Sequence, residues 1–134
     1  MCIRVLLVED EPSNAELVRE MLGADMRNTF EFTDAWCLSD ALAKLSGASF
    51  QAILLDLGLP DGDGLDVIRS VRAAAGETPI LVLTGLSDAQ MSAQVLGAGA
   101  NDYLGKHEMT AERLERALRT ITGHELEKAP VLES

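Results

Sequence analysis

Three short apolar runs divide the chain. They cover residues 5–8, 52–55 and 80–83, and each ends at polar or glycine-rich residues. Runs this short cannot form a helix, and they are typical of strands that are buried on both faces of a parallel sheet. Two weaker runs, residues 29–33 and 101–104, contain fewer apolar residues and partly alternate. We expect these two at the edges of the same sheet.

Between the runs, apolar residues recur at intervals of three and four, which is the spacing of one helix face. The groups are Val18, Met21 and Leu22; Ala41, Leu42 and Leu45; Leu65, Ile68 and Val71; Met91 and Val95; and Leu114, Leu118 and Ile121. Two pairs have the spacing of a capping box at a helix start: Ser13 with Glu16, and Ser87 with Gln90. Thr110 is a candidate cap for the last helix.

A strand followed by a helix thus occurs five times. Right-handed crossovers turn such a chain into a doubly wound sheet. With the strong strands in the centre and the weak ones at the edges, the strand order is 2-1-3-4-5. The sequence therefore predicts a flavodoxin-like (βα)5 α/β domain over residues 1–122. Residues 123–134 lose the periodicity and contain Pro130, and we expect a flexible C-terminal tail there.

Composition narrows the classes of function. The 134 residues are 47% hydrophobic and 25% charged, which suits one globular domain. No apolar stretch reaches the roughly 20 residues of a membrane helix, and no signal peptide precedes the first strand, so we expect a cytoplasmic protein without a membrane partner. The net charge of −11 disfavours direct contact with nucleic acid. Cys2 and Cys37 are too few for a disulfide framework and are interpreted as reduced thiols.

Polar residues follow four of the five predicted strands. An acidic segment, residues 9–11, follows the first strand, Asp56 the third, Thr84 the fourth and Lys106 the fifth. In open α/β sheets, ligands bind outside the carboxyl ends of the strands, so these residues should line one crevice. Carboxylates gathered there repel one another unless a cation lies between them. The sequence therefore predicts a cation site in this crevice.

Mg²⁺ is the expected ion, because it prefers oxygen ligands and is commonly held by one or two carboxylates with phosphate oxygens. Asp10 and Asp56 are the predicted direct ligands, with Glu9 acting through water and the backbone carbonyl of Gly58 as a further ligand. A carboxylate can also be a nucleophile that forms an aspartyl phosphate. Asp56 is the candidate, since it ends the central strand just before a turn-rich segment. Mg²⁺, Lys106 and the Thr84 hydroxyl would then neutralise charge on the phosphoryl oxygens.

Four stretches carry a resemblance to a known family. VLLVEDEP, AILLDLGLPDGDG, ILVLTG and GANDYLGK, together with the spacing of Asp10, Asp56, Thr84 and Lys106, resemble the receiver domain of two-component response regulators. The resemblance covers about residues 3–122. It implies a phosphorelay protein in which Asp56 accepts a phosphoryl group from a histidine kinase or a histidine phosphotransfer protein.

The resemblance also implies roles for single residues. Glu9 and Asp10 would form the acidic metal pocket, and Lys106 would pair with the phosphoryl oxygens. Thr84 would move to hydrogen-bond the phosphoryl group, and Tyr103 would change rotamer with it. The signal would pass by protein contacts to a downstream target that the sequence does not name. Such a phosphoacceptor promotes its own phosphorylation and dephosphorylation, and it is not an enzyme with turnover on other molecules.

One position departs from the family pattern. Receivers usually have proline after the lysine, with a cis peptide bond, whereas this chain has His107. A cis bond before a residue other than proline costs roughly 3–4 kcal/mol, so the loop is expected to be either trans and reshaped or strained. The departure favours one alternative function, a receiver-like interaction module that does not use phosphorylation.

Two further classes of function fit these residues less well. A flavodoxin-like cofactor binder would need hydroxyls, glycines or free N–H groups in its first loop, and residues 9–11 carry the wrong charge for a phosphate. An aspartyl phosphatase acting on separate substrates commonly has a second Asp two residues after the nucleophile, and Gly58 stands at that position. Both classes are therefore less favoured than the phosphoacceptor.

Overall fold

The computed structural model describes residues 2–23, 29–57, 59–61, 64–85 and 89–122. Strands and helices alternate along the chain, with one short 3-10 helix before the last helix. The elements are β1 (Cys2–Val8), α1 (Pro12–Gly23), β2 (Thr29–Ala35), α2 (Leu38–Gly47), β3 (Ala52–Asp56), α3 (Gly64–Ala75), β4 (Ile80–Thr84), α4 (Ala89–Ala98), β5 (Asp102–Gly105), η1 (Lys106–Glu108) and α5 (Ala111–Thr122). The predicted tail, residues 123–134, lies outside the described residues, so its nature stays a prediction.

The strands form one parallel sheet in the order β2-β1-β3-β4-β5, which confirms the predicted order. Every residue of β3 and β4 is buried, whereas β5 at the edge is mostly half-buried. The register places Asp56 opposite Leu83 and Thr84 opposite Gly105. The last residues of β3, β4 and β5 therefore lie side by side at one end of the sheet.

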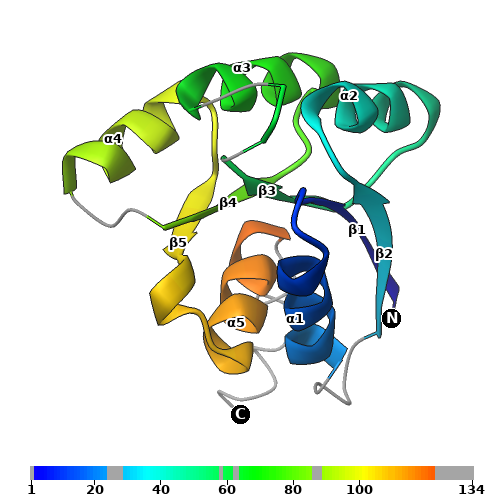
Figure 1. Cartoon of the computed structure of the whole chain (residues 1–134), viewed down its shortest axis with the longest axis vertical. Helices are drawn as coiled ribbons and strands as arrows, with labels where there is room; N and C mark the ends of the chain where they lie inside the picture. Colours follow the sequence, from blue (N-terminus) through cyan, green and yellow to red (C-terminus); the bar gives the residue numbers. More distant parts are fainter. Residues whose placement is uncertain (1, 24–28, 58, 62–63, 86–88, 123–134) are drawn as a thin grey trace, which may run out of the picture.

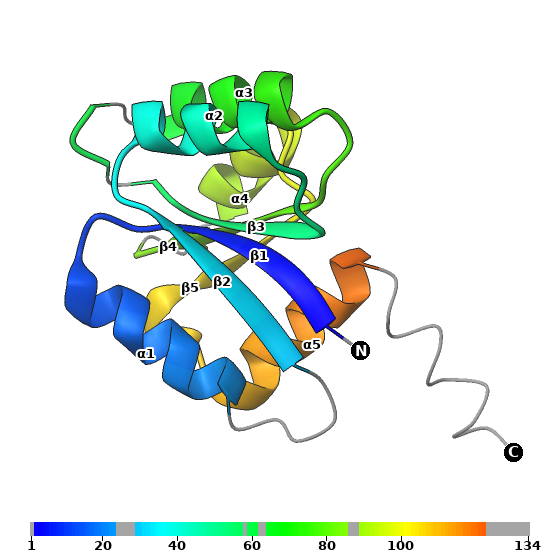
Figure 2. The ribbon, with the colours of Figure 1, turned by 90° about the vertical axis from the view of Figure 1, so that its right-hand side faces the viewer.

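Helices cover both faces of the sheet. Helices α1 and α5 lie on one face and α2, α3 and α4 on the other (Figures 1 and 2). Strand residues alternate between the two resulting cores: Leu54 packs with residues of α1 and α5, while Ile53 and Leu55 pack with residues of α2, α3 and α4. Burial on both faces explains why the central strands are apolar at every position. Among the described helices, none has the length and apolarity needed to cross a membrane.

The predicted helix caps had different outcomes. Thr110 caps α5, because its Oγ1 accepts the N–H of Arg113 at 3.1 Å. The prediction for Ser13 was wrong, since α1 begins one residue earlier, at Pro12. Proline suits the first helical position because its fixed φ fits the helix and it has no N–H to satisfy. The second predicted pair begins at Ser87, which lies outside the described residues.

Candidate functional site

The site lies at the carboxyl ends of β1, β3, β4 and β5. Glu9 and Asp10 follow β1 directly, and Asp56 is the last residue of β3. Thr84 ends β4, and Lys106 follows β5 as the first residue of η1. Because the strands are parallel, these segments that are distant in sequence meet at one edge of the sheet. The predicted convergence of the four loops is confirmed.

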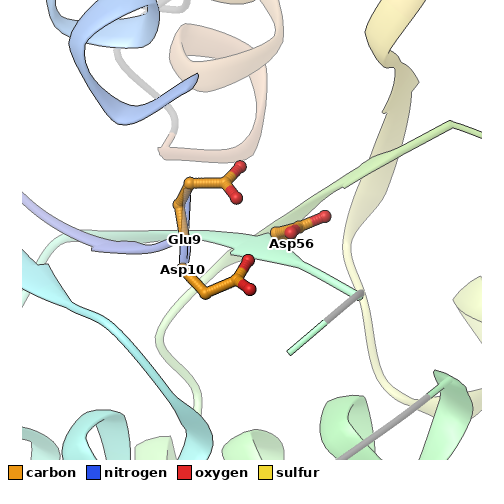
Figure 3. A group of neighbouring side chains, drawn as sticks. All are labelled: Glu9, Asp10 and Asp56. Carbon is orange, nitrogen blue, oxygen red and sulfur yellow. The ribbon is translucent and has the colours of Figure 1, made fainter. Parts of the chain in front are cut away.

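Three carboxylates gather at the centre of this edge. Glu9, Asp10 and Asp56 each offer one oxygen, and these oxygens all lie within 4.8 Å of one another. Figure 3 shows the Glu9 and Asp10 side chains extending from the end of β1 toward Asp56. Glu9 is 2% exposed and Asp56 7%, whereas Asp10 is exposed to solvent. The cluster therefore joins two buried acids to one that faces water.

Backbone groups fix Glu9 in place. Its N–H donates to the carbonyl of Ala35 at 3.0 Å, which continues the ladder between β1 and β2 beyond the strand end. Its Oε2 accepts the N–H of Glu11 at 3.2 Å. The side chain is thus held at the start of α1 with its second oxygen, Oε1, directed to Lys106.

Lys106 is the cation of the site. Its Nζ lies 3.0 Å from Asp56 Oδ1 and 3.4 Å from Glu9 Oε1. The described residues contain no cis peptide bond, so the bond from Lys106 to His107 is trans. Of the two expectations for this loop, the trans form is the one observed, and a 3-10 turn starts at Lys106. The histidine that replaces the usual proline therefore leaves the lysine in contact with both buried acids.

Burial and neighbouring charge shift two pKa values. Desolvation and the adjacent Asp56 raise the pKa of Glu9 to about 7, although Lys106 and the N–H of Glu11 act in the opposite direction. Burial of Lys106 disfavours its charge, but its hydrogen bonds and attraction to Asp56 and Glu9 outweigh burial and raise the pKa of Lys106. Lys106 is therefore protonated at neutral pH, and Glu9 titrates close to neutral pH.

The other predicted residues differ in placement. Thr84 is 4% exposed, and its register partner Gly105 immediately precedes Lys106. Tyr103 lies in β5 opposite Val82 and is partly buried against the core under α2, α3 and α4. Gly58, the predicted backbone ligand, lies outside the described residues. Thr84 is thus at the site edge, whereas Tyr103 lies further back along its strand.

The donor set suits Mg²⁺. All three atoms are carboxylate oxygens, the ligand type that this ion prefers, and one of the three acids is exposed and able to share the ion with water. Burial and, after it, the neighbouring Asp56 raise the pKa of Glu9, so a bound cation would stabilise the charged form of this acid. Glu9, Asp10 and Asp56 could hold such an ion, and Lys106 would compete with it for Glu9 and Asp56.

Asp61 is a residue near the site that no pattern in the sequence indicated. Its carboxylate accepts the backbone N–H groups of Leu38 at 2.7 Å and Ser39 at 3.0 Å, at the start of α2. In the sequence Asp61 is only one residue of a turn-rich segment. A cap supplied from another loop leaves no local pattern, because its partners are more than twenty residues away.

Fold and site together define a class of protein. The chain belongs to the family of response regulator receiver domains, which matches residues 5–119. This confirms the resemblance seen in the sequence and places the protein in two-component signalling. Similar proteins are known both from curated sequences and from solved structures.

The cell cycle transcriptional regulator CtrA of Caulobacter vibrioides is 36% identical to this chain over 126 residues. The match covers 91% of this chain and 53% of that regulator. The cell cycle response regulator CtrA of Brucella ovis has the same identity and coverage. The chain thus spans about half the length of these relatives.

Two solved structures of similar fold contain ligands of interest. The receiver domain of the sensor histidine kinase PA1611 from Pseudomonas aeruginosa has a magnesium ion in its active site cleft. It matches this chain with a TM-score of 0.76 and 30% identity, and the match covers 92% of this chain and 99% of that one. The structure of a response regulator from Burkholderia pseudomallei contains a phosphorylated aspartic acid, a calcium ion and citrate. It matches this chain with a TM-score of 0.75 and 26% identity, and the match covers 98% of this chain and 75% of that one.

Proposed function

We propose that the chain accepts a phosphoryl group on Asp56 in a Mg²⁺-dependent reaction and that the modified protein changes its contacts with a downstream protein. The donor is a histidine kinase or a histidine phosphotransfer protein. The observation that carries the proposal is the salt bridge of 3.0 Å between Lys106 and Asp56 beside two further acids. The proposal places this reaction in the cytoplasm, without a membrane or nucleic-acid partner.

The reaction is a phosphoryl transfer between side chains. An Asp56 oxygen forms the bond to phosphorus while the phosphorus–nitrogen bond of a phosphohistidine breaks and its electron pair stays on the imidazole. Hydrolysis of the aspartyl phosphate later returns the carboxylate and releases phosphate. Bound Mg²⁺ supplies neutralisation of carboxylate and phosphoryl oxygens. The chain promotes both of its own steps and does not turn over separate substrates.

Residues of the chain position and neutralise the group. Asp56 is the nucleophile, and Lys106, already in contact with it, pairs with the incoming phosphoryl oxygens. Asp10, Asp56 and the backbone carbonyl of Gly58 would hold the ion, with Glu9 acting through water. Thr84 moves to donate its hydroxyl to the phosphoryl group, and Tyr103 changes rotamer with it. A new dianionic group that recruits these partners biases a surface element between two states.

A second candidate function has one observation in its favour. The trans peptide before His107 departs from the usual form of the family loop, so the chain could be a receiver-like interaction module that works without phosphorylation. The contact of Lys106 with both Asp56 and Glu9 opposes this interpretation, because the ammonium group of Lys106 already lies beside the proposed acceptor, Asp56.

The test is to incubate the protein with acetyl phosphate, with and without MgCl₂, and to measure intact mass. We expect one phosphoryl adduct that requires Mg²⁺ and that is absent in Asp56→Asn. Asp66→Asn on α3 is the matched control, because this aspartate is exposed and pairs only with Arg69 across one helical turn among the described contacts. An adduct that survives in Asp56→Asn would overturn the assignment. Binding of Mg²⁺ without any adduct would favour the phosphorylation-independent module.

A further inference from the structure

Asp61 joins two loops at the site end of the sheet. It lies in the connection from β3 to α3, and each of its carboxylate oxygens accepts one backbone N–H from the first turn of α2. The N-cap residue of α2 is Cys37, whose side chain makes no capping hydrogen bond in the described structure. Asp61 therefore does for α2 what an N-cap side chain would otherwise do.

The same connection starts at Asp56. Two features hold the part of it that the structure describes: the side chain of Leu59, which is 6% exposed in the core under α2, α3 and α4, and the carboxylate of Asp61 two residues later. Gly58, whose carbonyl is the proposed ligand for the ion, immediately precedes Leu59 in the sequence. The backbone next to the acceptor is thus fixed at Leu59 by burial and at Asp61 by hydrogen bonds.

The hydrogen bonds of Asp61 favour its charged form. The N–H groups of Ser39 and Leu38 lower the pKa of Asp61, as expected for a carboxylate at a helix N-terminus. Each N–H is directed at a different oxygen of Asp61, so asparagine, which keeps only one oxygen, preserves one of the two hydrogen bonds as they are arranged. Alanine accepts from neither. Aspartate, asparagine and alanine at position 61 therefore form a graded series in which the cap on α2 has two, one and no hydrogen bonds.

We propose that Asp61 is a positioning residue of the phosphoryl site. By capping α2 from the acceptor loop, the connection from β3 to α3, it holds residues 59–61 of that loop in the position that binding of the ion and of the phosphoryl group requires. The inference rests on the proposed function and extends it to a residue that does not touch the reacting atoms. Its consequence is that the start of α2 is mechanically tied to the acceptor loop.

The test compares Asp61→Ala and Asp61→Asn with a matched control, Asp40→Ala. Asp40 lies in the first turn of α2, where its Oδ2 accepts the N–H of Trp36 at 3.1 Å and pairs with Lys44 at 3.4 Å. Its removal also weakens the start of α2, but these partners lie outside the acceptor loop. The measurements are Mg²⁺ affinity by calorimetry, the rate of adduct formation from acetyl phosphate, and urea unfolding.

We expect both Asp61→Ala and Asp40→Ala to lose stability. Only Asp61→Ala should bind Mg²⁺ more weakly, by about fivefold, which corresponds to the free energy of one typical cap. Adduct formation slows in the same variant, and Asp61→Asn falls between it and the wild type. If Asp61→Ala does not fold, the asparagine variant carries the comparison. Wild-type affinity in both Asp61 variants would overturn the inference, and so would an equal loss of affinity in Asp40→Ala. Failure of the wild type itself to bind Mg²⁺ would instead refute the proposed function.

Discussion

Glu9 is a carboxylic acid buried next to a second acid. Desolvation and Asp56 raise its pKa to about 7, so the metal-free protein holds a proton there that the unfolded chain releases near pH 4.5. For such a group, the contribution to stability is fully present below the unfolded pKa and is lost as pH rises through the folded pKa. The pair of acids is thus a stability cost that a cation would relieve.

This sets a pH dependence for the metal-free protein. In EDTA, we expect the free energy of unfolding to fall by about 3 kcal/mol between pH ~5 and pH ~8 through Glu9, at roughly 1.4 kcal/mol per pKa unit. Glu9→Gln should flatten this part of the curve, because glutamine stays neutral. The measurement is urea unfolding over that pH range.

Glu16→Gln serves as the control for the same chemical change, since Glu16 is exposed on α1. It should leave the slope of the curve unchanged. A slope that is the same in the wild type and in Glu9→Gln would show that the buried acid does not titrate in this range.

At this scale the sequence predicted which residues meet but not how each is buried. Glu9, Asp56 and Lys106 follow strongly patterned strands, so their shared edge could be predicted. Burial depends on the alternation of side chains: Glu9 continues the odd-numbered positions of β1 that face α1 and α5 and is buried, whereas Asp10, one residue further from the strand, is exposed. That assignment needed the register and the covering helices.

Among the elements, α3 is tied to the loop before β5 by Arg72. The Nε and Nη2 atoms donate to the carbonyl of Gly99 at 3.0 and 2.7 Å, and Nη2 also donates to Asn101 Oδ1 at 2.7 Å. Nη1 donates to the carbonyls of Gly76 and Thr78 at 2.7 and 2.8 Å. Gly99 has φ of 128°, and a Cβ there would come within 3.1 Å of Arg72, so the close approach needs glycine.

Loss of this network should destabilise the fold without affecting the site. We expect Arg72→Ala to lower the free energy of unfolding by about 2 kcal/mol, because several carbonyls lose a charged donor together. Arg69→Ala is the control on the same helix, where one exposed ion pair with Asp66 is worth less than about 1 kcal/mol. Urea unfolding measures both variants.

Mg²⁺ affinity should stay at the wild-type value in both, since Arg72 bonds to residues at the opposite ends of β4 and β5 from the site. Equal stability of the two variants would contradict the network's role. Nothing in the sequence indicated this link. Like the cap from Asp61, it joins residues far apart in the chain, whereas Thr110 could be predicted because its cap is local.

The whole molecule is strongly acidic. Its net charge is −11 at pH 7, and three acids share one edge of the sheet. The parallel order 2-1-3-4-5 brings this about, because it places the ends of β1 and β3 next to each other. The repulsion among all the charges of the molecule and the repulsion among the three acids of the site therefore lower the stability separately. The two respond to different salts.

NaCl screens the general repulsion, so the melting temperature should rise as the salt shortens the Debye length from about 30 Å at 0.01 M to about 10 Å at 0.1 M. At the same ionic strength, MgCl₂ should raise it further, since binding to the folded state alone adds about 1.4 kcal/mol at ten times the dissociation constant. In Asp56→Asn the NaCl effect should persist and the additional MgCl₂ effect should shrink, because one ligand is lost. Equal melting temperatures in the two salts at matched ionic strength would mean that the acidic cluster only adds to the overall charge and does not bind the ion.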